Sequence, residues 1–259
     1  MKIDPPPVNT IAPLRNVAAL DELLERLLNR DPNLPGFGIH HGPSGSGKSF
    51  AAMYAANKHR AYHVEVKSVW TRKHLCLAIL KDMGIQPAKT VAEMVDQIGE
   101  QLALSRRPLI IDEADILVDK GLIAVVKDIY ECCHGSIVLI GEELLPHKLK
   151  PIERVHGRVY DWAPAEPGTV ADARHLARLY CRGVVVAEDL LAALHEASTG
   201  SVRRICVNLA RVHEAAIGGD LEAIDLAAWQ SLGGVFFTGN PPARRADSMN
   251  GGFAAARRV

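Results

Sequence analysis

The spacing of hydrophobic residues changes along the chain, and it predicts where helices and strands form. Leu20, Leu23, Leu24, Leu27 and Leu28 share one face of a helix, which the Asp-Pro pair at 31–32 would end. Short apolar runs then alternate with helical patterns up to about residue 162. The chain therefore begins with a helix and continues as an alternating α/β segment.

Five short apolar runs in that segment predict strands, at 36–41, 61–66, 109–112, 136–141 and 159–162. Helical patterns lie between them, at 50–57, 72–83, 91–105 and 121–133. Strands that alternate with helices form a parallel sheet covered on both faces. The fold class expected here is α/β, with a parallel five-stranded sheet.

The pattern changes after the segment APAEPG at 163–168, which we interpret as a linker. Only helical patterns follow, at 170–180, 187–197, 201–216 and 221–232, and they predict a small all-helical lid domain. Four parts result: an extended proline-rich leader (1–15), the α/β domain (16–165), the lid (166–232) and a disordered basic tail (233–259).

Composition narrows the possible partners only slightly. Thirty basic residues balance thirty acidic ones, so a surface for nucleic acid would have to be a local patch. The five cysteines form no C-x-x-C pair, and no signal peptide or membrane-length apolar run is present, which indicates a cytoplasmic protein without a membrane partner. The eleven histidines have no metal-binding spacing, so the one metal expected is nucleotide-bound Mg²⁺.

A glycine-rich motif follows the first predicted strand and precedes a helix. Backbone N–H groups around its glycines can surround phosphates, because no side chain blocks their approach and a helix N-terminus is positive. In the P-loop pattern the lysine reaches the outer phosphates and the serine binds Mg²⁺. The predicted nucleotide-binding residues here are Gly42, Pro43, Ser44, Gly45, Ser46, Gly47, Lys48, Ser49 and Phe50.

A second acidic element supports this interpretation. The apolar run PLII, at 108–111, ends in Asp112 and Glu113. Asp112 is placed to hold Mg²⁺, and Glu113 to activate a water molecule for attack on the γ-phosphate. Although the letters DEAD follow, a DEAD-box helicase needs a second motor domain, and only about seventy residues of helical pattern remain.

Arginines occupy two places where they can act on a nucleotide. Arg154 and Arg158 precede the last predicted strand, and Arg203 and Arg204 begin a helix of the lid. An arginine from a neighbouring subunit can stabilise charge on the transferred phosphoryl group, and an arginine on a lid can sense that group. The alternative for each is an ordinary solvated side chain.

These motifs, in this order, resemble the Walker A, Walker B, arginine-finger and sensor-2 elements of the AAA+ ATPases. The segments VEVKSVWTRKHL, PLIIDEAD, IVLIGEELL and RVHGRV look more specifically like the DNA-transposition ATPases, the group of the phage Mu B protein, TnsC and TniB. The resemblance covers about residues 8 to 230. It implies ATP bound between subunits, a ring or helical filament on double-stranded DNA, and a transposase as partner.

Two departures from the family pattern stand out. The Mu B protein has a helical DNA-binding domain before its ATPase, whereas about fifteen residues precede the first predicted helix here. The fourth strand ends in IGEEL, where the family usually has a small polar sensor-1 residue. Glu142 or Glu143 would have to take that role.

Two basic segments are candidates for DNA contact. Lys67, Arg72 and Lys73 lie around Trp70 after the second predicted strand and can bind phosphates without reading bases. In the tail, the basic residues are Arg244, Arg245, Arg257 and Arg258. For both segments the alternative is a solvated charge cluster, which in the tail would only aid solubility.

Three functions follow from these residues. The first is an ATP-dependent regulator that assembles on duplex DNA and selects or activates it for a transposase. The second is a helicase loader of the DnaC or IstB kind. The third is a P-loop kinase for a small molecule, against which Glu113 argues because phosphoryl transfer to an acceptor needs no water-activating carboxylate.

Overall fold

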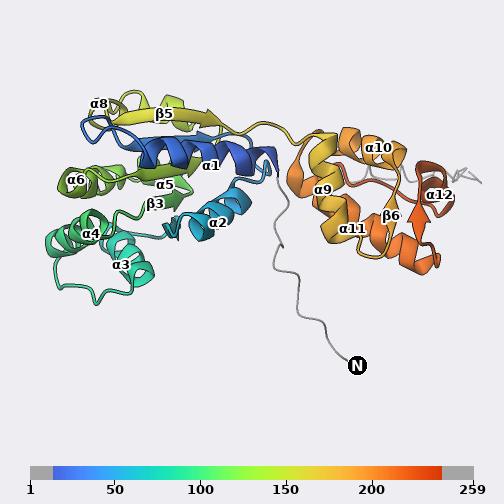
Figure 1. The fold of residues 1–259 in the computed structure, drawn as a ribbon, viewed down its shortest axis with the longest axis horizontal. Coiled ribbons are helices and arrows are strands. Elements are labelled where there is room, and N and C mark those ends of the chain that lie inside the picture. Colours follow the sequence, from blue (N-terminus) through green and yellow to red (C-terminus); the bar gives the residue numbers. More distant parts are fainter. Residues whose placement is uncertain (1–13, 241–259) are drawn as a thin grey trace, which may run out of the picture.

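The computed structural model describes residues 14–240, which fold into an α/β domain and a smaller, mainly helical domain (Figure 1). The α/β domain contains a five-stranded sheet in the order β2-β3-β4-β1-β5. All of its pairings are parallel, as the alternating pattern predicts. The strands are β1 (Phe37–His41), β2 (Tyr62–Glu65), β3 (Leu109–Asp112), β4 (Ile137–Gly141) and β5 (Val159–Pro164).

Alternate residues of the central strands pack into two different cores. In β4, Val138 and Ile140 pack with α1 and α2, while Ile137 and Leu139 pack with α3, α4 and α6. The sheet is thus covered on both faces, as continuous apolar strands require. The helices of this domain are α1 (Arg15–Leu28), α2 (Lys48–Lys58), α3 (Arg72–Met83), α4 (Val91–Ser105), α5 (Ala114–Asp119), α6 (Ile123–Cys133), α7 (Leu145–Leu149) and α8 (Glu153–His156).

The parallel strands place all their carboxyl ends at one edge of the sheet. In Figure 1 the arrowhead of β5 points toward the small domain, so this carboxyl edge faces it. The glycine-rich loop follows β1, and Asp112 closes β3. The chemistry-bearing residues therefore lie between the two domains, where ligands of open α/β sheets bind.

The small domain is built mainly of helices, and its core joins the layer of α1 and α2. One feature differs from the sequence prediction: two short strands pair in parallel, Val185 with Ala223 and Val186 with Ile224. Two-residue strands are too short to leave an alternating pattern, and the predicted helix at 221–232 begins only after β7. The elements are α9 (Val170–Tyr180), β6 (Val185–Val186), α10 (Glu188–Ser198), α11 (Val202–Gly218), β7 (Ala223–Ile224) and α12 (Leu226–Ser231).

The two ends of the described chain are more ordered than the composition suggested. Leu14, assigned to the extended leader, is buried, and α1 begins at Arg15. At the other end, the Phe237 amide donates to Asn208 Oδ1 (2.7 Å), and Asn208 Nδ2 donates back to the Phe237 carbonyl (3.0 Å). The prediction of disorder from 233 is therefore wrong for 233–240. The tail arginines lie outside the described residues.

A further observation concerns membranes. Within 14–240, none of the helices combines the length and the apolar character that a bilayer crossing needs.

Candidate nucleotide site

The glycine-rich loop turns sharply between β1 and α2. Gly45 and Gly47 have φ values of 81° and 90°, a left-handed conformation that other residues adopt only with strain. A Cβ at Gly45 would also lie 2.8 Å from Ser201 Oγ at the start of α11. The glycines thus form the turn and admit the small domain close to the loop.

Lys48 bends back over the loop that precedes it. Its Nζ donates to the carbonyl oxygens of Gly42 (2.7 Å) and Pro43 (2.8 Å). Burial lowers the pKa of Lys48, while the carboxylates of Asp112 and Glu142 act in the opposite direction. An ammonium group that is bound only by neutral carbonyls can exchange them for phosphate oxygens, which carry full charge.

Asp112 and Glu113 lie at the end of β3 with different surroundings. Asp112 is buried, and its Oδ1 accepts a hydrogen bond from the Glu113 amide (2.8 Å). Glu113 has a φ of 59°, a left-handed conformation that costs a non-glycine residue about 1–2 kcal/mol. Burial raises the pKa of Glu113, with a further rise from Asp112. Strain and a raised pKa at one carboxylate are typical of functional sites.

A cavity of about 360 Å³ lies between the loop and the small domain. Most of the predicted site residues line it, namely Ser44, Gly45, Gly47, Lys48, Ser49, Phe50, Asp112, Glu113 and Arg203. Gly42, Pro43 and Ser46 belong to the loop but are not in this lining. Of the two sensor-1 candidates, Glu142 lines the cavity and Glu143 does not.

The residues of the opposite wall of the cavity were not predicted from the sequence. Its residues come from the start of α1, from α9 and the turn after it, and from α11: they are Leu14, Leu176, Leu179, Tyr180, Arg182 and Cys206. Mostly apolar side chains of this kind suit a flat, weakly polar group such as a nucleobase. Helical periodicity marks Leu176 as a core position, but nothing in the local sequence indicates that its neighbours face a ligand.

Backbone contacts connect the loop to the small domain. The Arg203 amide donates to the Gly45 carbonyl (3.1 Å), which fixes the first turn of α11 against the loop. Asn16, which is buried, donates through Nδ2 to the carbonyls of Ser46 and Glu166 (2.8 Å each). The Glu166 amide donates back to Asn16 Oδ1 (3.0 Å). Asn16 therefore joins α1, the loop and the interdomain linker, a role that sequence analysis missed.

Arg154 and Arg158 lie away from this cavity. They precede β5, and the Arg158 carbonyl accepts from the amide of Phe37 at the start of β1 (3.0 Å), so both lie toward the amino edge of the sheet. The Arg158 guanidinium bonds Glu131 and the Arg154 carbonyl. The structure does not bring them to the site of their own chain. They could contact a bound nucleotide only in the site of another copy of the chain.

The candidate DNA-contact residues lie at the carboxyl end of β2. Lys67 is exposed in a turn, where its carbonyl accepts from the Trp70 amide (2.9 Å). Arg72 and Lys73 are exposed in the first turn of α3, and within 14–240 none of the three forms an ion pair with a carboxylate. Val69 between them is 79 % exposed. The three basic side chains are thus exposed within one short segment of the chain, at 67–73.

The donor set of the cavity fits magnesium nucleotide. Ser49 and Asp112 offer oxygen ligands, which Mg²⁺ prefers, and both line the cavity beside Lys48. The left-handed glycines leave backbone N–H groups without an intervening Cβ, as a phosphate cradle requires. We infer that these residues fit the group that the motif implies.

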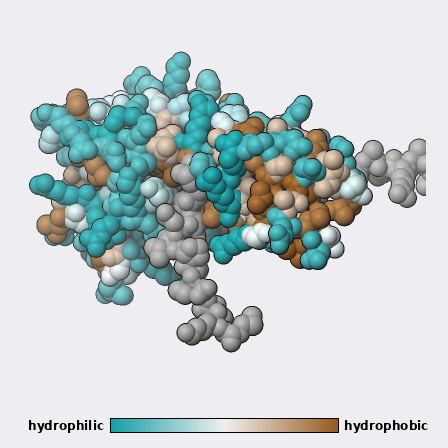
Figure 2. Space-filling view, turned by 45° about the vertical axis from the view of Figure 1, so that its right-hand side comes forward, coloured by the Kyte–Doolittle hydropathy of each residue, from teal (hydrophilic) through white to brown (hydrophobic). Residues whose placement is uncertain are grey.

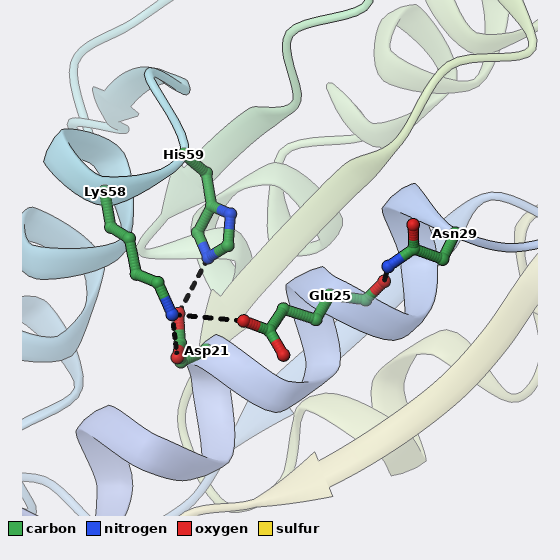
Figure 3. A network of polar contacts seen from close by, with 5 residues as sticks. All are labelled: Asp21, Glu25, Asn29, Lys58 and His59. Atoms are coloured by element: carbon green, nitrogen blue, oxygen red, sulfur yellow. Dashed lines mark hydrogen bonds and ion pairs between the residues drawn. The ribbon is translucent and has the colours of Figure 1, made fainter.

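A second group of candidate metal ligands is already bound by a lysine (Figure 3). Asp21, Glu25 and His59 offer three ligand atoms close together. Lys58 Nζ lies between the carboxylates, 2.6 Å from Asp21 and 3.1 Å from Glu25, and His59 Nε2 lies 2.7 Å from Asp21. The cation here is an ammonium, so the group joins α1 to α2.

Comparison with known proteins agrees with this geometry. Residues 31–149 match the model of a family described as "AAA domain". No curated protein matches the chain significantly by sequence.

Solved structures share the fold at low sequence identity. The Orc1 protein of Aeropyrum pernix in complex with DNA matches with a TM-score of 0.61 and 19 % identity, covering 87 % of this chain and 66 % of that one. Cdc6p of Pyrobaculum aerophilum has a TM-score of 0.56 and 18 % identity, covering 85 % and 66 %. A point mutant of Thermotoga maritima RuvB has a TM-score of 0.58 and 17 % identity, covering 86 % and 70 %.

This chain therefore spans just under two thirds of the length of the Orc1 and Cdc6p structures. At such identities the likeness establishes the architecture alone. Residues 31–149, which hold the P-loop and the acidic strand end, are thus similar to the family described as "AAA domain", and the chain has the AAA+ P-loop fold.

Proposed function

We propose that the protein binds and hydrolyses ATP, assembles on double-stranded DNA in its ATP-bound form, and selects or activates that DNA for a transposase. The observation that supports this most is the composition of the interdomain cavity. It combines Lys48, Asp112 and Glu113 from the sheet edge with Arg203 from the small domain. We expect these partners to meet in the cytoplasm.

Different residues of the cavity bind different parts of the magnesium nucleotide. Lys48 and the loop amides hold the phosphates, Ser49 and Asp112 hold Mg²⁺, and the apolar wall receives the base. When bound, Mg²⁺ neutralises phosphate charge. The Arg203 amide fixes α11 to the loop at Gly45. Contact of the Arg203 side chain with the γ-phosphate would therefore affect the position of the small domain.

Glu113 is the residue that we assign to hydrolysis. Its carboxylate accepts a proton from the attacking water, whose oxygen bonds to the γ-phosphorus while the bond to the ADP oxygen breaks. The raised pKa of Glu113 makes it a better proton acceptor than an ordinary carboxylate. A kinase that transfers phosphate to a small acceptor would need no such group, so we do not favour that alternative.

Assembly follows from the position of the two remaining arginines. Arg158, or Arg154 as the alternative, lies away from the cavity of its own chain and would complete the site of a neighbouring copy. Nucleotide at the junction between copies would then stabilise a ring or filament. In free protein Arg158 bonds Glu131, so assembly would exchange that partner for phosphate.

DNA contact is assigned to Lys67, Arg72 and Lys73. Their charges are free of carboxylate partners in the described chain, and phosphate binding by such groups is independent of sequence. The Orc1 structure that shares this fold is in complex with DNA. A helicase loader with the same surface remains the second candidate, since it differs mainly in its partner.

Electron microscopy of the protein with duplex DNA and a slowly hydrolysed ATP analogue tests the proposal. We expect rings or filaments only when both are present. Lys67→Glu with Lys73→Glu should abolish them while ATP binding persists, and addition of a transposase or a helicase separates the two candidates. Protein that stays monomeric with saturating nucleotide and DNA would contradict the proposal.

A further inference from the structure

A second cavity lies at the amino edge of the sheet, at the opposite ends of the strands from the nucleotide site. Its volume is about 660 Å³. Three arginines line it, Arg60, Arg106 and Arg107, together with His59 and Ser105. No acidic side chain belongs to its lining in the described chain. The cavity is therefore a concentrated positive region in a protein with no net charge.

Strand pairing explains why these arginines meet. Arg60 lies between α2 and β2, and Arg106 and Arg107 lie between α4 and β3. Tyr62 pairs in register with Leu109, and its amide donates to the Pro108 carbonyl (2.9 Å). Because β2 and β3 are parallel neighbours, the two connecting segments enter the sheet side by side.

One of the guanidinium groups is held in place. Arg107 Nε donates to the Arg60 carbonyl, and the Arg107 guanidinium carbon lies 3.9 Å from the centre of the Tyr62 ring. Cation–π contact of this kind orients the planar group. The two terminal nitrogens of Arg107 have no hydrogen-bond or ion-pair partner within 14–240, so their N–H groups can bind a ligand.

The other two arginines are exposed and have a left-handed backbone, as residues at the C-terminal ends of helices often do. Arg60 and Arg106 have φ values of 53° and 54°, which glycine or asparagine would adopt at lower cost. Neither side chain has a carboxylate partner within the described chain. Two exposed arginines without carboxylate partners beside one oriented arginine form a set that can bind an anion.

The carboxylates that contact His59 and its neighbour Lys58 already have cationic partners. Lys58 binds Asp21 and Glu25, and His59 binds Asp21 as well (Figure 3). The guanidinium groups of Arg60, Arg106 and Arg107 thus remain available to an external anion. Guanidinium matches the paired oxygens of a phosphate better than any other side chain does.

We propose that this arginine cavity binds the phosphodiester backbone of duplex DNA, as a second contact besides Lys67, Arg72 and Lys73. The two basic regions lie at opposite ends of the edge strand β2, whose four residues span about 13 Å. A duplex that contacts both regions would run along that edge of the sheet. The proposal rests on the DNA-binding part of the proposed function, but it does not require nucleotide, because the arginines lie away from the nucleotide site.

Fluorescence anisotropy with a labelled duplex and no nucleotide tests this contact. Arg60→Asn with Arg106→Asn removes two charges and keeps residues that tolerate the left-handed backbone. We expect roughly tenfold weaker binding at about 50 mM salt, and a salt dependence whose slope falls by about 2, near one per lost phosphate contact. Arg178→Gln removes an exposed charge from α9 and should leave binding unchanged.

The outcomes separate this proposal from the proposed function. If the double asparagine variant binds duplex with the affinity and salt slope of the wild type, while Lys67→Glu with Lys73→Glu loses ATP-dependent retention, the arginine contact is wrong and DNA binding stands. If the wild type binds no duplex without nucleotide but is retained on duplex with an ATP analogue, only the arginine contact is wrong. If it binds no duplex in either condition, both are wrong. Equal competition by inorganic phosphate and by duplex phosphate would identify a site for free anions and overturn the proposal.

Discussion

The two walls of the nucleotide cavity are built from the chain in different ways. The wall from the α/β domain comes mainly from short continuous motifs, the part of the loop at 44–50 and the pair Asp112 and Glu113. The wall from the small domain consists of single residues such as Leu176 and Cys206, spread over α9 and α11. Phosphate chemistry needs a set of polar groups in fixed order, whereas an apolar surface for a base can come from any helices that pack there.

The surfaces of the two domains differ as well. In Figure 2 the visible face of the α/β domain is mostly hydrophilic, while hydrophobic residues gather over the small domain. Several apolar side chains of that domain are exposed, including Val185, Ile217 and Val235. The two walls therefore belong to domains with different surface chemistry, and α1 connects them through Asn16.

The largest expected effect falls on the polar wall. Glu113→Gln removes the proton acceptor and should lower the rate of ATP hydrolysis by about 10²- to 10⁴-fold, with nucleotide affinity nearly unchanged. Phosphate release and binding of a fluorescent ATP analogue measure the two quantities. Glu100→Gln on the exposed face of α4 is the control. Normal hydrolysis by the Glu113 variant, with loss in Glu142→Gln, would transfer the role to Glu142.

The pH dependence of hydrolysis tests the same assignment of Glu113 as the proton acceptor. Burial raises the pKa of Glu113, and the group acts as a base only when ionised. The rate should therefore fall as the pH falls through that raised pKa and reach a plateau above it. The residual rate of Glu113→Gln should lack this fall. A pH profile shared by both proteins would exclude Glu113 as the titrating base.

Loss of Lys48 should have the next largest effect. Lys48→Ala removes the ammonium that we expect at the outer phosphates, and charge-assisted hydrogen bonds of this kind contribute about 2–3 kcal/mol, or roughly 30- to 150-fold in affinity. Equilibrium binding of an ATP analogue measures it. Lys81→Ala, on an exposed turn of α3, should bind normally. Equal affinity in both variants would show that the loop lysine does not contact phosphate.

The apolar wall should contribute less for each residue. Leu179→Ala removes part of the surface that we assign to the base, and should weaken ATP binding by roughly 5- to 30-fold, the effect of about 1–2 kcal/mol of lost apolar contact. Binding of inorganic triphosphate, which has no base, should stay the same. If both ligands lose affinity equally, Leu179 acts through the fold and not through the base.

Loss of the Asn16 side chain, which connects the two walls, should have the smallest effect on ATP binding. Its effect on the stability of the protein should be measurable. Asn16→Ala leaves the Ser46 and Glu166 carbonyls without their donor, and should lower the free energy of unfolding by about 1–3 kcal/mol. Urea denaturation measures it. Asn33→Ala, in an exposed turn, is the control. An unchanged midpoint in Asn16→Ala would mean that these bonds contribute nothing to stability.

The same contrast explains how far the sequence could predict the molecule. The parallel sheet, most of its helices and the polar residues of the site follow from local patterns, because alternating apolar runs and a fixed motif suffice. Tyr180 and Arg182 could not be assigned to the site, since their place depends on how the small domain packs. Asn16 was also missed, because one polar residue among several in an amphipathic helix forms no motif.

The sequence-based prediction of secondary structure and order was wrong in two places. Gly, Pro and Arg after 233 suggested disorder, yet Phe236 stacks on Trp229 with ring centres 5.5 Å apart. The strands β6 and β7 have two residues each and leave no periodic signal. In both cases a long-range contact determines the structure.

The central claim is that one nucleotide contacts both walls of the interdomain cavity. Photolabelling of the intact protein with an azido-ATP tests it most directly, with mass spectrometry to locate the modified residues and excess ATP as competitor. We expect competable label in α9 or α11, near Leu179 or Cys206, as well as near the glycine-rich loop. Label confined to residues 14–165 would contradict it.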